Sequence, residues 1–141
     1  MALTTDWTNL QAPSLDDFEQ LATAALESLP QPFRDLTRDV RCYVSEFAET
    51  DVLDELGIES EFDLMGLFTG VGGTEEGITP TGRLPNTIHL YRRAILDYWA
   101  EHEETLGAVV AHVLIHEIGH HFGFSDADME ALEEQAAREA K

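Results

Sequence analysis

Two histidines and a glutamate in the last third of the chain have the spacing of a zinc site. His116 and His120 are four residues apart, and Glu117 directly follows the first of them. Residues four apart in an α-helix lie one turn above another, so both imidazoles can bind one Zn²⁺ at about 2.0–2.1 Å. Glu117 projects about 100° around the helix, where a carboxylate can reach a water on the metal without being a ligand. The spacing therefore predicts two ligands and a general base.

A third ligand has to come from beyond this helix, because catalytic zinc commonly has three protein ligands and one water. Gly123 is placed to end the helix in a left-handed conformation and turn the chain back. Asp126, three residues later, can then point its carboxylate at the same metal, at a bond length of about 2.0–2.2 Å. We expect His116, His120 and Asp126 to hold Zn²⁺.

Other interpretations of the histidines stay open. His112 lies one turn before His116 and forms a competing pair of the same spacing, but it lacks the following glutamate. We expect it to be packed or to support a ligand, and we expect His121 to be structural. The whole segment can also be a buried helix with incidental histidines and a glycine cap. Buried polar residues need partners, which argues against that interpretation.

With these residues the chain resembles the predicted zinc-dependent proteases with a minimal metalloprotease-like domain, a small bacterial branch of the zincins. The shared motif has the form His-Glu-x-x-His-x-x-Gly-x-x-Asp, matched here by His116, Glu117, His120, Gly123 and Asp126. By this resemblance the two histidines and Asp126 are the metal ligands, and Glu117 is the catalytic base. The resemblance also extends, more loosely, to two segments, 64–70 and 84–93.

The resemblance covers residues 15–133 and implies a reduced zincin fold and the hydrolysis of peptide bonds by a metal-activated water. We therefore expect a peptide or protein substrate. In zincins an edge strand pairs with the extended substrate, and residues 62–71 or 87–91 could supply that edge. The alternative is a catalytically silent metal-binding module with an interaction or regulatory role.

The rest of the sequence predicts the elements that position these residues. Ser14 and Asp17 resemble a capping box, and apolar residues recur at helical spacing after them. Further patterns predict strands at 40–44, 62–71 and 87–91, and helices at 15–29, 51–56, 94–102, 103–122 and 128–139. This order favours an α+β fold, a three-stranded sheet packed against helices with the motif helix at the centre.

These predicted elements divide the chain into a tail and one domain. We expect a flexible N-terminal tail over residues 1–13 and a single minimal metalloprotease-like domain over 14–141. Residues 72–85, which are rich in glycine and proline, are predicted to form a loop.

The composition of the chain limits which kinds of partner it can bind. The 141 residues carry a formal net charge of −20, so general electrostatics excludes nucleic acid and anionic membranes and favours cations. Cys42 is the only cysteine, which excludes an internal disulfide and fits a reducing compartment. The N-terminus lacks signal-peptide features, and the apolar stretch 106–118 is too short to span a bilayer. We expect a cytoplasmic monomer.

Four polar residues in or just after the third predicted strand are further candidates. Arg92 and Arg93 can clamp a substrate carboxylate or stabilise an oxyanion, but pairing with the abundant acids is the favoured interpretation. Tyr91 can donate to an oxyanion, although a packed aromatic is simpler. His89 alternates away from its apolar neighbours, which places it on the other face of the strand.

Overall fold

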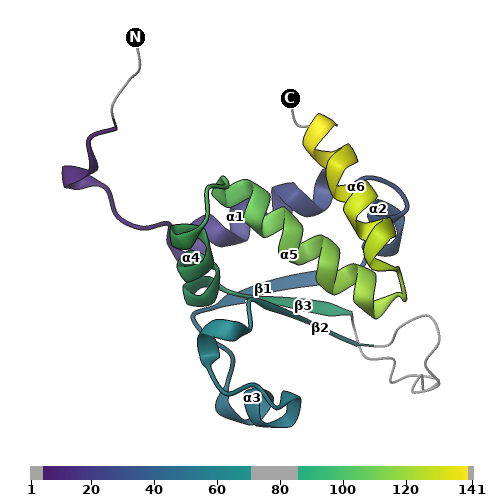
Figure 1. The fold of residues 1–141 in the computed structure, drawn as a ribbon, viewed down its shortest axis with the longest axis horizontal. Helices are drawn as coiled ribbons and strands as arrows, with labels where there is room; N and C mark the ends of the chain where they lie inside the picture. The colour runs from purple at the N-terminus through teal and green to yellow at the C-terminus, as the bar shows by residue number, and fades with distance from the viewer. Residues whose placement is uncertain (1–4, 71–85, 140–141) are drawn as a thin grey trace.

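A computed structural model describes residues 5–70 and 86–139 of the chain (Figure 1). Within these ranges the helices are α1 (Leu15–Glu27), α2 (Phe33–Leu36), α3 (Thr50–Leu56), α4 (Arg92–Glu101), α5 (Leu106–His121) and α6 (Asp126–Glu139). The strands are β1 (Arg41–Ser45), β2 (Gly66–Thr69) and β3 (Thr87–Tyr91), and two 3-10 turns, η1 (Trp7–Asn9) and η2 (Glu61–Asp63), complete the described elements. None of these helices is long and apolar enough to cross a membrane.

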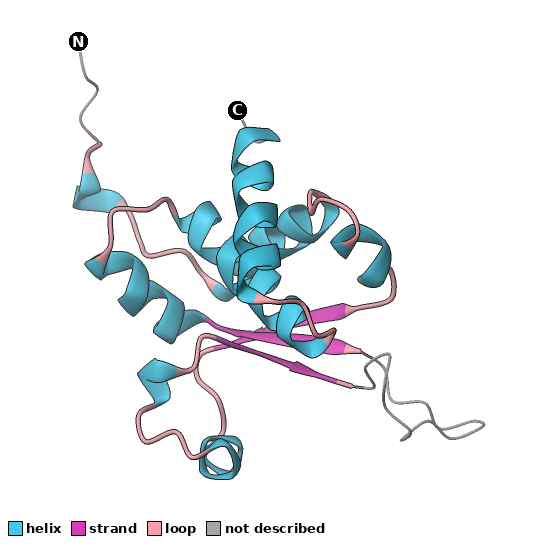
Figure 2. Cartoon of the chain, turned by 45° about the vertical axis from the view of Figure 1, so that its right-hand side comes forward, coloured by secondary structure: helices cyan, strands magenta, loops and turns pink. Residues whose placement is uncertain are grey.

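The three strands form one mixed sheet in the order β1-β3-β2. β1 runs parallel to β3, while β2 runs antiparallel to it. Helices α1, α2, α5 and α6 lie on one face of the sheet, and α3 lies beyond the other face (Figures 1 and 2). The predicted α+β architecture is therefore confirmed. Because β3 is central, the segment 87–91 cannot be a substrate-pairing edge, whereas β2 has a free edge among the described strands.

The core is built around α5, as its nearly continuous apolar sequence predicted. Six of its side chains are at most 4% exposed: Val109, Val110, Val113, Leu114, Ile115 and Ile118. They pack with Phe18 of α1, with Phe33 of α2, and with Ile88 and Leu90 from the facing side of β3. α5 is held against the strands because apolar side chains from the sheet and from three helices are buried together.

Local signals set the ends of the helices. The Ser14 hydroxyl accepts the Asp17 backbone N–H, and the Asp17 carboxylate accepts the Ser14 N–H, which confirms the capping box. Gly123 has φ +82° after α5, and the Phe124 N–H donates to the Gly119 carbonyl at 2.8 Å. The Ser125 hydroxyl then accepts an N–H from the first turn of α6 at 3.1 Å. The chain is thereby turned back over α5 (Figure 1).

The predicted strand over 62–71 is wrong at its start. The Ser60 hydroxyl accepts the Phe62 N–H at 3.2 Å and begins the turn η2 instead of a strand. Phe62 then packs edge-on against Phe47, with ring centroids 5.0 Å apart, and β2 begins only at Gly66. The predicted loop 72–85 lies outside the described residues. The extent of the tail and the single-domain plan stay predictions.

Candidate metal centre

The close approach of α5 to β2 depends on a glycine. A Cβ placed on Gly66 would lie 2.7 Å from Val113 Cγ1, 3.2 Å from the His89 carbonyl oxygen and 3.4 Å from Glu117 Cγ. Only a residue without a side chain leaves room for Val113 and Glu117 at this point. The Glu117 carboxylate consequently lies beside β2, where it accepts a hydrogen bond from the Phe68 backbone N–H.

The surroundings of Glu117 raise the pKa of its carboxyl group. Burial raises the pKa of this carboxyl above its ordinary value of 4.5, because the charged form loses water. The positive character of His120 and His116 and the Phe68 N–H work in the opposite direction but do not cancel the effect of burial. A carboxylate with a raised pKa is better matched to accepting a proton near neutral pH.

A second glycine brings α6 onto α5. A Cβ on Gly119 would lie 2.8 Å from Met129 Cγ and closer still to its sulfur, and Met129 is fully buried. Glu133 lies one turn beyond Met129 on α6. His116 and His112 lie one and two turns back from Gly119 on α5, so this packing places Glu133 over both histidines.

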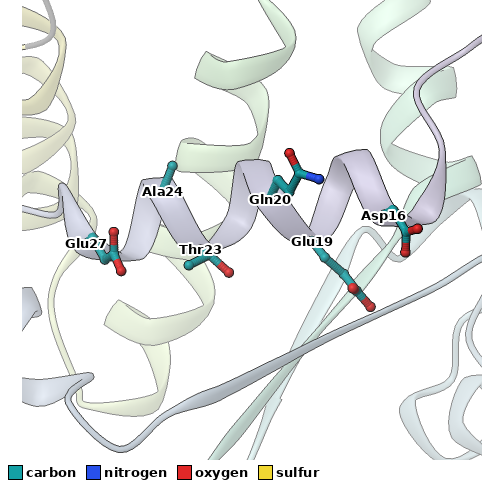
Figure 3. Close-up of a pocket in the computed structure, with 6 residues that line it drawn as sticks. All are labelled: Asp16, Glu19, Gln20, Thr23, Ala24 and Glu27. Atoms are coloured by element: carbon teal, nitrogen blue, oxygen red, sulfur yellow. The ribbon is translucent and has the colours of Figure 1, made fainter.

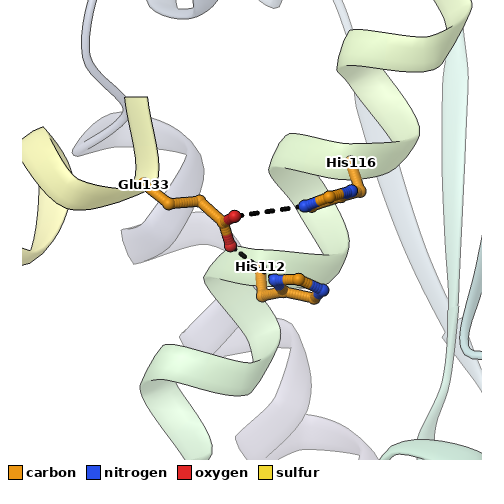
Figure 4. A group of neighbouring side chains, drawn as sticks. All are labelled: His112, His116 and Glu133. Atoms are coloured by element: carbon orange, nitrogen blue, oxygen red, sulfur yellow. Dashed lines mark hydrogen bonds and ion pairs between the residues drawn. The ribbon is translucent and has the colours of Figure 1, made fainter. Parts of the chain in front are cut away.

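These three side chains form a tight group (Figure 4). One Glu133 oxygen lies 2.5 Å from His112 Nδ1, and the other lies 3.1 Å from His116 Nε2. Among the described residues, this is the group of three potential ligands whose ligand atoms all lie within 4.8 Å of one another. Glu133 is a potential ligand that the sequence motif did not predict. Its i+4 spacing from an inward-facing Met129 was the available signal.

The predicted ligands are brought together only in part. His120 Nε2 lies 3.7 Å from Asp126 Oδ1, and their side chains are 60% and 92% exposed. The rings of His116 and His120 are 5.9 Å apart between centroids and nearly perpendicular. His116 Nε2 faces Glu133 instead. The assignment of His116, His120 and Asp126 as ligands therefore stays a prediction.

The donors themselves fit zinc. Neighbouring ligand atoms of a tetrahedral zinc lie about 3.3–3.6 Å apart when its bonds are about 2.0–2.2 Å long. The 3.7 Å between His120 Nε2 and Asp126 Oδ1 is close to that spacing. Two imidazole nitrogens and one carboxylate oxygen are also a ligand set that zinc accepts. Engaging His116 with this pair requires its ring to leave Glu133.

The remaining residues with two interpretations take structural roles. Arg92 lies 2.9 Å from Glu46 and donates to the Pro13 carbonyl at 2.6 Å, so the favoured pairing with an acid is confirmed. The Arg93 guanidinium lies over the Phe47 ring, 5.5 Å from its centroid.

Three further side chains also behave as the sequence predicted. Tyr91 is buried, with an exposed fraction of 5%. His121 is packed, because its ring stacks on Phe68 with centroids 4.0 Å apart, but its buried Nε2 has no hydrogen-bond partner among the described residues. His89 stacks between Tyr43 and Tyr91, on the face of β3 opposite the inward-facing Ile88 and Leu90.

A hollow elsewhere on the molecule is unrelated to this centre. It runs along the exposed side of α1 (Figure 3) and is lined by Asp16, Glu19, Gln20, Thr23, Ala24 and Glu27. Since all of its lining comes from one helix and includes no histidine, it offers none of the ligand pairs described above.

Comparison with known proteins agrees with the motif. The family model described as zincin-like metallopeptidase matches residues 37–136, which span β1 to α6 and include every histidine and carboxylate discussed for the metal centre. No match was found among curated proteins. The family implies a metal, typically zinc. The match covers more than two thirds of the chain, and the chain belongs to the zincin-like metallopeptidase family.

Proposed function

We propose that this protein is a zinc-dependent metallopeptidase that hydrolyses peptide bonds, with Zn²⁺ held by His116, His120 and Asp126. A zinc ion at this position would supply Lewis acidity toward a scissile carbonyl and an attacking water. The proximity of His120 to Asp126 supports this ligand set, as does the family match.

The observation that carries the proposal is the place of Glu117. This carboxylate is half-buried, interacts electrostatically with His116 and His120, and is hydrogen-bonded to the backbone of β2. In the role we propose, Glu117 accepts a proton from the attacking water and passes it to the leaving amine. Its raised pKa favours the first half of that transfer, the acceptance of the proton from water.

The position of β2 suggests how a substrate would meet Glu117. β2 pairs with β3 on one side only, and the Phe68 N–H is given to Glu117 rather than to a strand. An extended peptide that added to this free edge would run beside the Glu117 carboxylate. We therefore propose peptides or unfolded protein segments as substrates, because these can adopt the extended conformation.

The test is Glu117→Gln, assayed on quenched fluorescent peptide mixtures and unfolded casein with zinc-loaded protein. The zinc content should persist, while kcat/KM falls at least 100-fold, since a general base contributes about 10²–10⁴ in rate. Glu130→Gln, on an exposed position of α6, is the matched control and should keep full activity. A Glu117→Gln protein that cleaves as fast as the unmodified chain would contradict the mechanism.

A metal-binding module without turnover is the second candidate. The contact between His116 Nε2 and Glu133 favours it, because it takes one predicted ligand away from His120 and Asp126. In that case zinc would bind and raise Tm, while the unmodified chain and Glu117→Gln would be equally inactive on every peptide tested.

A further inference from the structure

We propose that His112, His116 and Glu133 form a second zinc position where α6 crosses α5, separate from the set of His116, His120 and Asp126 and sharing one residue with it. The proposal concerns metal binding alone, so it does not depend on the peptidase activity proposed above.

The ligand atoms are already assembled. Glu133 lies 2.5 Å from His112 Nδ1 and 3.1 Å from His116 Nε2, and the two imidazole centroids are 4.1 Å apart. Around a tetrahedral zinc these atoms would lie about 3.3–3.6 Å apart. The two contacts of Glu133 would have to lengthen by about 1 Å or less to admit the ion.

The chemistry of the group suits zinc. Two neutral imidazole nitrogens and a carboxylate oxygen are ligands that Zn²⁺ prefers, and three of them leave a fourth position for water. Both Glu133 oxygens face histidines, and no lysine or arginine of the described residues pairs with this carboxylate. Within the described ranges, no positively charged side chain therefore occupies the position.

The electrostatic surroundings also favour a cation. Burial and the carboxylates of Glu104 and Glu133 raise the pKa of Tyr98, whose hydroxyl donates to Glu104 at 3.5 Å. The chain as a whole carries a net charge of −20. A divalent ion gains from such a potential, most at low ionic strength.

The group is rigidly placed yet reachable. The packing of Met129 against Gly119 fixes α6 over α5, so Glu133 cannot move far from the histidines. The side chains of His112, His116 and Glu133 are 40%, 28% and 25% exposed, so an ion can enter from solvent. A prearranged set loses less entropy on binding a metal than a flexible one.

Both proposed zinc positions include the His116 ring. The nitrogen of His116 that faces Glu133 cannot bind two ions, so zinc at the α5–α6 crossing withdraws this ring from His120 and Asp126. We therefore infer that the two positions compete for His116.

The experiment measures zinc binding by calorimetry with chelator-treated full-length protein and zinc chloride. The starting variant is His120→Ala with Asp126→Asn, which removes two ligands of the first set. Both side chains are mostly exposed, so the fold should persist, as circular dichroism can verify. To this variant are added, one at a time, Glu133→Gln, His112→Ala and the control Glu134→Gln, the exposed neighbour on α6.

The starting variant should still bind one zinc ion per chain. Adding Glu133→Gln or His112→Ala should weaken the affinity at least tenfold, and Glu134→Gln should leave it unchanged. The proposal is overturned if the folded starting variant binds no zinc, or if Glu133→Gln and Glu134→Gln bind equally well. Should the double substitution unfold the chain, the single variant His120→Gln takes its place with the same outcomes.

Discussion

The close contact between Gly119 and Met129 predicts how much an alanine at position 119 lowers the free energy of unfolding. A second glycine on the same helix, Gly107, supplies the control. Replacing Gly119 by alanine would bring a methyl group to within 2.8 Å of Met129 Cγ, in a fully buried position. Gly107, near the start of α5, has no neighbouring atom within 4 Å of such a methyl group.

Two effects oppose each other at Gly119. Alanine stabilises a helix by about 1 kcal/mol relative to glycine, and an overpacked core costs about 1–3 kcal/mol. Gly107→Ala should therefore stabilise the chain by up to about 1 kcal/mol. Gly119→Ala should be less stable than Gly107→Ala by about 1–3 kcal/mol, because the propensity gain is similar in both and only the packing cost differs.

The assay is urea unfolding followed by circular dichroism, with Tm as a second measure. A chain of this size loses roughly 2–4 °C of Tm per kcal/mol. If Gly119→Ala proved as stable as Gly107→Ala, the proposed close packing of α6 on α5 would be refuted. The placement of Glu133 over the histidines would then lose its physical basis.

Three further predictions concern other parts of the fold. Burial raises the pKa of the Cys42 thiol to about 11, from an ordinary 9.0, so its reactive thiolate is about 100-fold scarcer than in an unfolded chain. Iodoacetamide should therefore modify Cys42 about 100-fold more slowly in the folded than in the denatured protein at pH 8. The rate in the folded protein should rise tenfold per pH unit until about pH 11. Equal rates in folded and denatured protein would argue against the burial of this thiol. Ser14→Ala removes half of the capping box of α1 and should cost about 1 kcal/mol in urea unfolding, whereas an unchanged midpoint would show that the cap contributes nothing. Gly66→Ala should cost about 1–3 kcal/mol, since the His89 backbone carbonyl cannot move aside as a flexible side chain can; a variant of unchanged stability would mean that α5 is not held so close to β2.

Much of the fold could be predicted because its signals are local. The capping residues of α1, the left-handed Gly123 and the alternation over 87–91 act within a few residues, and each has the predicted structure. The predicted strand over 62–71 failed for an equally local reason, the turn that Ser60 initiates. The order of the strands, with β3 in the centre, depends on long-range pairing that no local pattern specifies.

In the candidate site, too, residues positioned by local spacing could be predicted and residues positioned by long-range packing could not. His116, Glu117 and His120 share one helix, so their spacing alone predicted a metal-binding surface. Glu133 could not be placed that way, because its position depends on how α6 crosses α5 and on the absence of a side chain at Gly119. The orientation of the His116 ring follows from that crossing and not from the motif.

The most direct test of the proposed zinc centre is a crystal structure of the chain with one equivalent of zinc, with anomalous diffraction recorded on both sides of the zinc absorption edge. The proposed catalytic centre predicts a zinc peak about 2.0–2.2 Å from nitrogens of His116 and His120 and from an Asp126 oxygen. A peak bound by His112, His116 and Glu133, with Asp126 unengaged, would contradict the proposed catalytic centre.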